Sequence, residues 1–186
     1  MEFFHCQIEK IFLTHGHHDH CSGIAKLLNS IGEIPVYMNQ NDFHLFKGVV
    51  EEGKTLGLNI PMNFVNDNDL VSVGTREGRV ITTPGHTQGS CCYQFGTFLF
   101  TGDTLFKRSI GRTDLEGGDS QAIMDSIQKK LFLLPYATTV LCGHGPITTL
   151  AEEMAKNPYV GLGNWSVCYI YHKKKLEVTS TFARVV

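Results

Sequence analysis

Thr14-His15-Gly16-His17-His18-Asp19-His20 places four potential metal ligands, His15, His17, Asp19 and His20, within six positions. Side chains two residues apart point the same way in extended backbone, so we expect His15 and His17 to converge on one ion. Gly16 lets the chain bend, and a turning loop then aims Asp19 and His20 at a second point. This density of ligands predicts metal binding, with room for two ions, better than it fits a polar loop with incidental histidines.

The apolar pattern around this segment predicts a mixed α/β domain. Ile8, Ile11, Phe12 and Leu13 indicate a buried strand over 7–14 that delivers the ligands at its C-terminal end. Short apolar runs between turn residues, with a hairpin turn at 95–97, place a sheet in the middle of the chain. The remaining expected elements are helices over 21–31, 41–52 (ended by Gly53) and 119–131, and strands over 35–38, 70–73, 79–83, 90–94, 98–101 and 140–142.

Three further motifs follow predicted strands, and each has a glycine directly before a ligand-type residue. They are Pro84-Gly85-His86-Thr87, Thr101-Gly102-Asp103-Thr104 and Cys142-Gly143-His144-Gly145-Pro146. A glycine at a strand end lets the loop turn sharply and brings the next side chain over the edge of the sheet. The motifs therefore supply His86, Asp103 and His144 as the remaining ligands of a two-metal centre. Asp67-Asn68-Asp69 is better explained as a turn.

Composition narrows the class of protein. A chain of 186 residues suits one domain, and 16 basic against 18 acidic residues give a net charge of −2, which does not indicate nucleic-acid binding. Six cysteines form no C-x-x-C pair, and no signal peptide or long apolar span is present. We therefore expect a reduced, cytoplasmic protein that does not enter membranes, and the sequence leaves the oligomeric state open.

The four motifs, in this order, resemble those of the metallo-β-lactamase superfamily of hydrolases. The resemblance implies an α/β fold, the αββα sandwich, and Asp19 and Asp103 as catalytic residues. It also implies how the ligands divide between two ions: His15, His17 and His86 hold the first, Asp19, His20 and His144 hold the second, and Asp103 bridges them.

Within the superfamily, the chain looks most like single-domain hydroxyacylglutathione hydrolases of the glyoxalase II type. Asp103-Thr104-Leu105-Phe106, Gly111-Arg112-Thr113-Asp114 and Asn157-Pro158-Tyr159 carry this likeness. It implies hydrolysis of a small thioester such as S-acylglutathione by a hydroxide shared between two divalent ions, with zinc favoured and iron or manganese compatible with the ligands. Arg112 takes the place of a basic residue that grips glutathione, whereas Asp114 replaces an aromatic residue of larger members.

Two alternatives remain at this stage. A persulfide dioxygenase with a single iron shares the Gly-Arg-Thr-Asp stretch, and a truncated, non-catalytic family product would keep the ligands.

The resemblance covers about residues 7–161, so we expect a domain over 1–161 and a tail of unknown role over 162–186. Family members place several strands and a helix before the first motif, whereas thirteen residues precede Thr14 here. The expected domain is therefore N-terminally incomplete, with an open sheet edge and exposed apolar surface.

Overall fold

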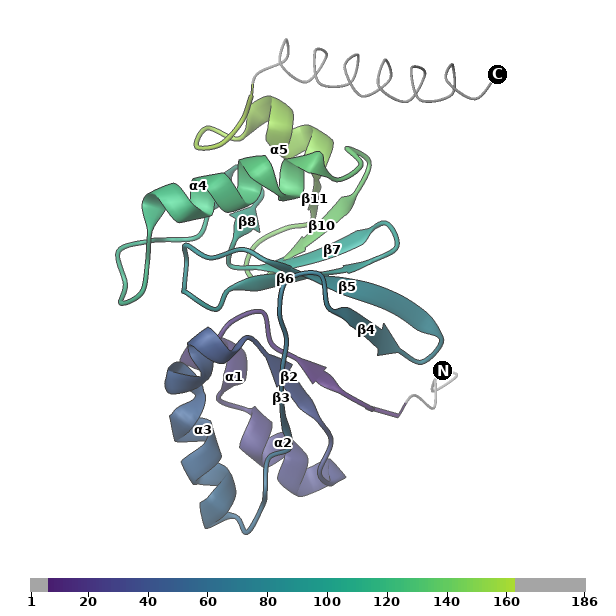
Figure 1. The fold of residues 1–186 in the computed structure, drawn as a ribbon, viewed down its shortest axis with the longest axis vertical. Coiled ribbons are helices and arrows are strands. Elements are labelled where there is room, and N and C mark those ends of the chain that lie inside the picture. The colour runs from purple at the N-terminus through teal and green to yellow at the C-terminus, as the bar shows by residue number, and fades with distance from the viewer. Residues whose placement is uncertain (1–6, 163–186) are drawn as a thin grey trace.

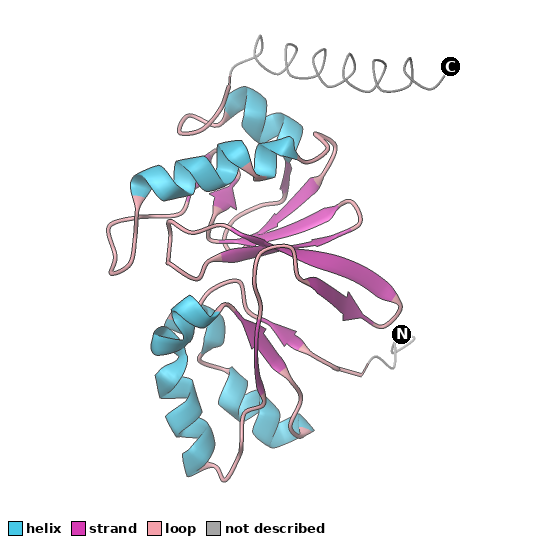
Figure 2. Ribbon diagram, in the orientation of Figure 1, coloured by secondary structure: helices cyan, strands magenta, loops and turns pink. Residues whose placement is uncertain are grey.

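The computed structural model describes residues 7–162, in which two sheets face each other and helices cover their outer sides (Figure 1). Helices α2 and α3 lie against one sheet, and α4 and α5 lie against the other. Figure 2 shows the same four layers by type of secondary structure. The predicted αββα order is therefore confirmed.

The first sheet is parallel and has the order β1-β2-β3. Parallel neighbours cannot be joined by a tight hairpin, so helices connect these strands. Leu28, Met38 and Phe46 are fully buried between the sheet and its helices. The elements of this half are β1 (Ile11–Phe12), α1 (His18–Cys21), α2 (Ile24–Ile31), β2 (Val36–Met38), η1 (Gln40–Asp42), α3 (Phe43–Thr55) and β3 (Met62–Phe64).

The second sheet has six strands in the order β11-β10-β7-β6-β5-β4. Neighbouring strands are antiparallel except β10 and β7, which are parallel. A small two-stranded sheet, β8-β9, lies beside it. The elements are β4 (Leu70–Val73), β5 (Arg76–Thr82), β6 (Cys91–Phe95), β7 (Phe98–Gly102), β8 (Leu105–Phe106), β9 (Ser109–Ile110), α4 (Ser120–Lys129), η2 (Leu131–Leu133), β10 (Thr139–Cys142), β11 (Thr148–Thr149) and α5 (Leu150–Lys156).

Three apolar clusters fill the spaces between the layers. One lies between the first sheet and its helices, and a second lies between the other sheet and α4 and α5. The third joins the two sheets, and in it the ring of Phe12 contacts the rings of both Tyr37 and Tyr93. Because three strands face six, Phe98 and Phe100 of β7 remain 50% and 43% exposed.

Several predicted boundaries were wrong for local reasons. The helix expected over 21–31 is two helices, α1 and α2, and α1 begins early enough to contain Asp19 and His20. Gly53 does not end α3, because it stays helical and lies against Ile60. The turn at Asp67-Asn68 is confirmed: Asn68 has a φ of 67°, and Asp67 Oδ1 accepts a hydrogen bond from the Thr82 amide.

Most of the predicted tail, residues 163–186, lies outside the described part of the chain. Leu162 is described, and it packs against the cluster under α4 and α5. Within residues 7–162, no helix has both the length and the apolar character needed to cross a bilayer.

Candidate metal centre

The structure brings the seven predicted ligands together at the C-terminal ends of strands. His15 and His17 follow β1, Asp19 and His20 lie in α1, and the other three residues follow β5, β7 and β10. Nitrogen and oxygen atoms lie within 4.8 Å of one another in each of three groups that could hold an ion. The groups are His15, His17 and His86; His15, His20 and Asp103; and Asp19, His20 and His144.

Hydrogen bonds orient the histidines of the first group. The Nδ1 of His86 lies 2.8 Å from the carbonyl oxygen of Arg112, which can only accept, so Nδ1 carries the proton and Nε2 is free to bind an ion. That Nε2 lies 2.9 Å from the Nδ1 of His17. The Nδ1 of His15 lies 3.1 Å from the Thr14 hydroxyl, which leaves its Nε2 facing inward.

Asp103 lies between the groups. Its Oδ1 is 3.3 Å from His20 Nε2, and its Oδ2 is 3.5 Å from His144 Nε2 and 3.7 Å from His86 Nε2. Within the described residues, two buried side-chain atoms have no hydrogen-bond partner, and both are here: His15 Nε2 and Asp103 Oδ1. Buried polar atoms normally have a partner, so this pair fits a bound metal ion.

The protonation states suit ligands. Burial, followed by the neighbouring His20, lowers the pKa of His15 to about 3, so His15 is neutral at pH 7. Burial, followed by His86, also lowers the pKa of His17. Burial acts to raise the pKa of Asp103, but His20, whose Nε2 lies 3.3 Å from Oδ1, and the other nearby imidazoles hold this pKa below its ordinary value. His15 and His17 therefore favour the neutral form that binds metal ions, and Asp103 favours the ionised form.

One side of the centre is open. The side chains of Asp19 and His144 are 61% and 58% exposed, whereas those of His86 and Asp103 are 3% and 12% exposed. A substrate would therefore approach from the side of Asp19 and His144. The ring of Phe106 stands 6.2 Å from that of His144 and forms an apolar part of this rim.

Comparison with known proteins agrees with this architecture. Residues 6–144 match the metallo-beta-lactamase superfamily. The chain belongs to this superfamily. Its relatives include an uncharacterized protein of Aquifex aeolicus (37% identical; 81% of this chain, 74% of the relative) and the probable metallo-hydrolase YqgX of Bacillus subtilis (34%; 81% and 74%). A third relative is the hydroxyacylglutathione hydrolase GloC of Haemophilus influenzae (30%; 82% and 76%).

Several solved structures share this fold. The BLEG-1 B3 metallo-beta-lactamase is 35% identical with a TM-score of 0.70, over 82% of this chain and 77% of that one. ETHE1 from Myxococcus xanthus is 32% identical with a TM-score of 0.68, over 84% and 64%. TTHA1623 in a di-iron-bound form is 34% identical with a TM-score of 0.68, over 81% and 76%. Divalent metals are bound in this superfamily, and the present chain retains groups that could hold them.

The glycines before the three later candidate ligands serve two purposes in this member of the metallo-beta-lactamase superfamily. Gly85 and Gly102 have φ values of 137° and 48°, which favour glycine, so these two form the sharp turns that the sequence predicts. Gly143 is needed for space, because a Cβ there would overlap Asp103 Oδ1 and lie 2.9 Å from His20. The third motif thus needs glycine because its main chain passes close to Asp103 and His20.

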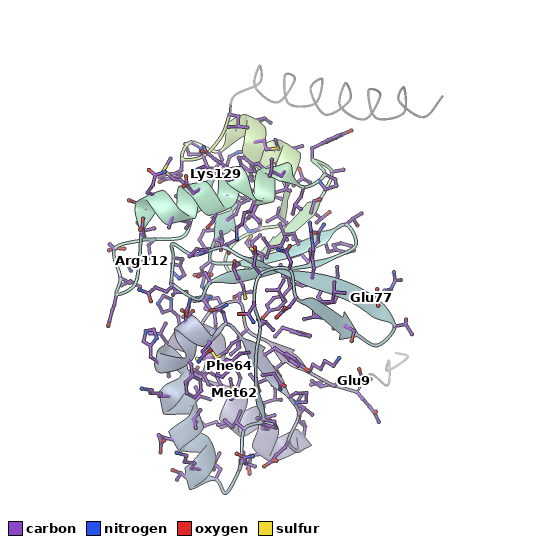
Figure 3. The ribbon with its side chains drawn as sticks, in the orientation of Figure 1. Glu9, Met62, Phe64, Glu77, Arg112 and Lys129 are labelled. Carbon is purple, nitrogen blue, oxygen red and sulfur yellow. The ribbon has the colours of Figure 1, made fainter. Side chains whose placement is uncertain are left out.

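Arg112 lies at the edge of the centre, on the loop after β9 (Figure 3). Its main chain orients His86, whereas its guanidinium group makes two hydrogen bonds to Asp114, of 2.8 and 2.7 Å. Both side chains are largely exposed. The predicted contact of Arg112 with substrate stays a prediction, and Asp114 would compete for the same guanidinium group.

Sequence reasoning missed Asp42, a fully buried carboxylate at the start of α3. Its oxygens accept hydrogen bonds from both loops that carry the first group of histidines. No motif marks it, because an aspartate before a helix is common for other reasons. The side chain of His18 is exposed, and this residue belongs to none of the three groups.

The cysteines near the centre are expected to be unreactive. Burial raises the pKa of Cys21 and Cys92 to about 11 and that of Cys91 to about 12. A rise from 9 to 11 lowers the thiolate population about a hundredfold. Iodoacetamide at pH 8 should therefore leave these three residues unmodified in the folded protein and label them in denaturant, as read by peptide mass spectrometry. Rapid labelling of native Cys21 would instead reveal an activated thiol.

Proposed function

We propose that this protein is a hydrolase of small thioesters that uses two divalent metal ions, with zinc favoured. His15, His17 and His86 would hold one ion, and Asp19, His20 and His144 the other. Asp103 would serve both, and its position carries the proposal: one carboxylate oxygen faces His20 while the other faces His86 and His144. A carboxylate can present two oxygens to two ions, which an imidazole cannot.

The ions, when bound, would supply a water of lowered pKa as nucleophile and a Lewis acid for the thioester carbonyl. The residues of the chain do the rest. Asp103 is held ionised beside His20, so it can accept a hydrogen bond from the attacking water and fix its direction. Asp19 and His144 stand at the open side, where Asp19 can receive a proton during the reaction. The buried cysteines have raised pKa values, which argues against a thiol nucleophile.

Three features support a thioester as substrate and the cytoplasm as location. GloC, a hydroxyacylglutathione hydrolase by name, is 30% identical over most of both chains. Gly111-Arg112-Thr113-Asp114 is in place, with Arg112 beside the metal centre. Four free cysteines in the described residues fit a reducing compartment.

A second candidate is a persulfide dioxygenase with one iron, because ETHE1 from Myxococcus xanthus has the same fold at 32% identity. The Asp19, His20 and His144 group favours the hydrolase, because it provides ligands for a second ion. Metal content separates the two: one iron per chain together with sulfur-dependent oxygen consumption would establish the dioxygenase.

The test is an assay of metal-reconstituted protein against a panel of thioesters, with oxyesters of the same acyl groups as controls. We expect hydrolysis of at least one thioester, two ions per chain, and a rate that rises through a single ionisation near neutral pH, because a water in the centre must lose a proton. Reconstitution with zinc, iron and manganese in parallel identifies the preferred metal. Two bound ions without any thioester hydrolysis would contradict the proposed substrate class.

A further inference from the structure

We propose that Asp42 is a positioning residue that sets the affinity for the ion at His15, His17 and His86 and leaves the ion at Asp19, His20 and His144 unaffected. The inference rests on the metal centre of the proposed function. It does not depend on the substrate, because its readout is metal binding.

The side chain of Asp42 joins two loops that are distant in sequence. Its Oδ2 accepts hydrogen bonds from the Gly16 amide at 3.0 Å and from the Thr87 hydroxyl at 2.7 Å. Its Oδ1 accepts a hydrogen bond from the Gly89 amide at 2.6 Å. Gly16 lies between His15 and His17, and Thr87 directly follows His86. One carboxylate therefore holds together the loops that carry all three histidines of the first group.

The surrounding main chain is shaped to this carboxylate. A Cβ at Gly89 would lie 2.6 Å from the Asp42 Cγ, and a Cβ at Gly16 would lie 2.8 Å from the Asp42 carbonyl oxygen. Thr87 is fixed in turn, since its hydroxyl lies 2.6 Å from that of Ser90, which also accepts the Thr87 amide. Both loops thus approach Asp42 closely enough to exclude any side chain larger than glycine at these two positions.

A role in capping α3 does not explain this arrangement. Asp42 occupies the N-cap position, yet its side chain makes no hydrogen bond to the helix. Hydrogen bonds from amide and hydroxyl donors to a buried carboxylate are charge-assisted, and an unpaired buried carboxylate is costly, so the loops have a strong reason to stay where Asp42 places them.

The effect should be confined to one ion. Asp19 and His20 lie in α1, and His144 follows β10, and within residues 7–162 the side chain of Asp42 makes no hydrogen bond to any of these three. Loss of an outer partner of a metal ligand typically lowers metal affinity ~10–100-fold. Asp42→Asn keeps the shape but turns one acceptor into a donor facing an N–H or O–H group.

The experiment measures each ion separately. His144→Ala removes a ligand of the second group and His86→Ala removes one of the first, so zinc titrations against a competing chelator report one remaining ion in each background. Adding Asp42→Asn should lower the zinc affinity of the remaining site in the His144→Ala background by roughly 10–100-fold. The same change should alter the zinc affinity in the His86→Ala background by less than about threefold.

Glu153 offers a matched control, because it is also fully buried and accepts hydrogen bonds from Thr148, Asn157 and Arg108. Glu153→Gln should lower the unfolding temperature and leave both zinc affinities unchanged. Thr87→Val is a milder probe that retains Asp42 and should give a smaller loss at the first ion, so the test survives if Asp42→Asn does not fold.

The outcomes separate the two proposals. Equal weakening in both backgrounds, or no weakening in the His144→Ala background, would overturn the role of Asp42 while the metal centre stands. Failure of the unsubstituted protein to bind zinc would overturn the proposed function and this inference together.

Discussion

Asp103→Ala is expected to remove both metal ions and to abolish thioester hydrolysis. Asp103 presents one oxygen towards His20 and the other towards His86 and His144, so its carboxylate faces candidate ligands of both ions. Losing a shared ligand should lower the affinity for both ions by more than the ~10–100-fold that follows loss of a residue hydrogen-bonded to a metal ligand. Elemental analysis after gel filtration measures the metal content, and a thioester assay measures turnover.

Asp114→Ala is the control for removing a carboxylate from a nearby loop. Asp114 is exposed and pairs with Arg112, so its loss should leave the metal content at two ions per chain. If Asp103→Ala also retained two ions per chain, the shared position of Asp103 would be wrong, and each ion would need a complete ligand set of its own.

Gly85→Ala should give a large loss of stability, because it combines a positive φ with an overlap between the added methyl group and main-chain atoms. Gly85 has a φ of 137°, and a Cβ there would overlap the main chain of Ile123 in α4. Main-chain overlap cannot be relieved by a side-chain rotation, so α4 or the His86 loop must move. We expect a loss of about 3 kcal/mol or more in the free energy of unfolding, and a lower zinc affinity because His86 follows directly.

Gly57→Ala is the control for a positive φ without main-chain overlap. Gly57 also has a positive φ, of 75°, but a Cβ there would meet open space. Its substitution should therefore cost about 1–2 kcal/mol, from backbone strain alone. Urea unfolding of both variants measures the difference, which reports the overlap with Ile123 together with the more extreme φ of Gly85. Equal losses would mean that the loop before His86 adapts to the extra methyl group.

The clustering of the candidate ligands could be predicted from the sequence, because metal chemistry restricts ligands to a few residue types and strand ends bring short motifs to one edge. Asp42 could not, because its role depends on Gly16, Thr87 and Gly89, which are near it only after folding. Glu153 is similar, since its partners Arg108 and Thr148 belong to other elements.

The secondary structure also divides into elements that the local sequence indicates and elements that depend on contacts made on folding. Strand β4 was predicted at its observed bounds, because alternating apolar residues between turns mark it locally. Strands β8, β9 and β11 are two residues each, and pairing with a neighbour defines them more than their own composition does. The early start of α1 escaped prediction because its histidines and aspartate carry no apolar period.

The candidate ligands follow strands of both sheets, so a bound ion would connect segments that are distant in the sequence. His17 and His86 are 69 positions apart, and His20 and His144 are 124 positions apart. An ion held by each pair would close a loop of that size and act as a reversible cross-link between the two halves of the sandwich. In the chain-entropy treatment of cross-links, closing a loop of this size restricts the unfolded chain and raises the free energy of unfolding by roughly 4–5 kcal/mol. A chelator would therefore act on this protein as an unfolding agent as well as an inhibitor, because it reopens both loops at once.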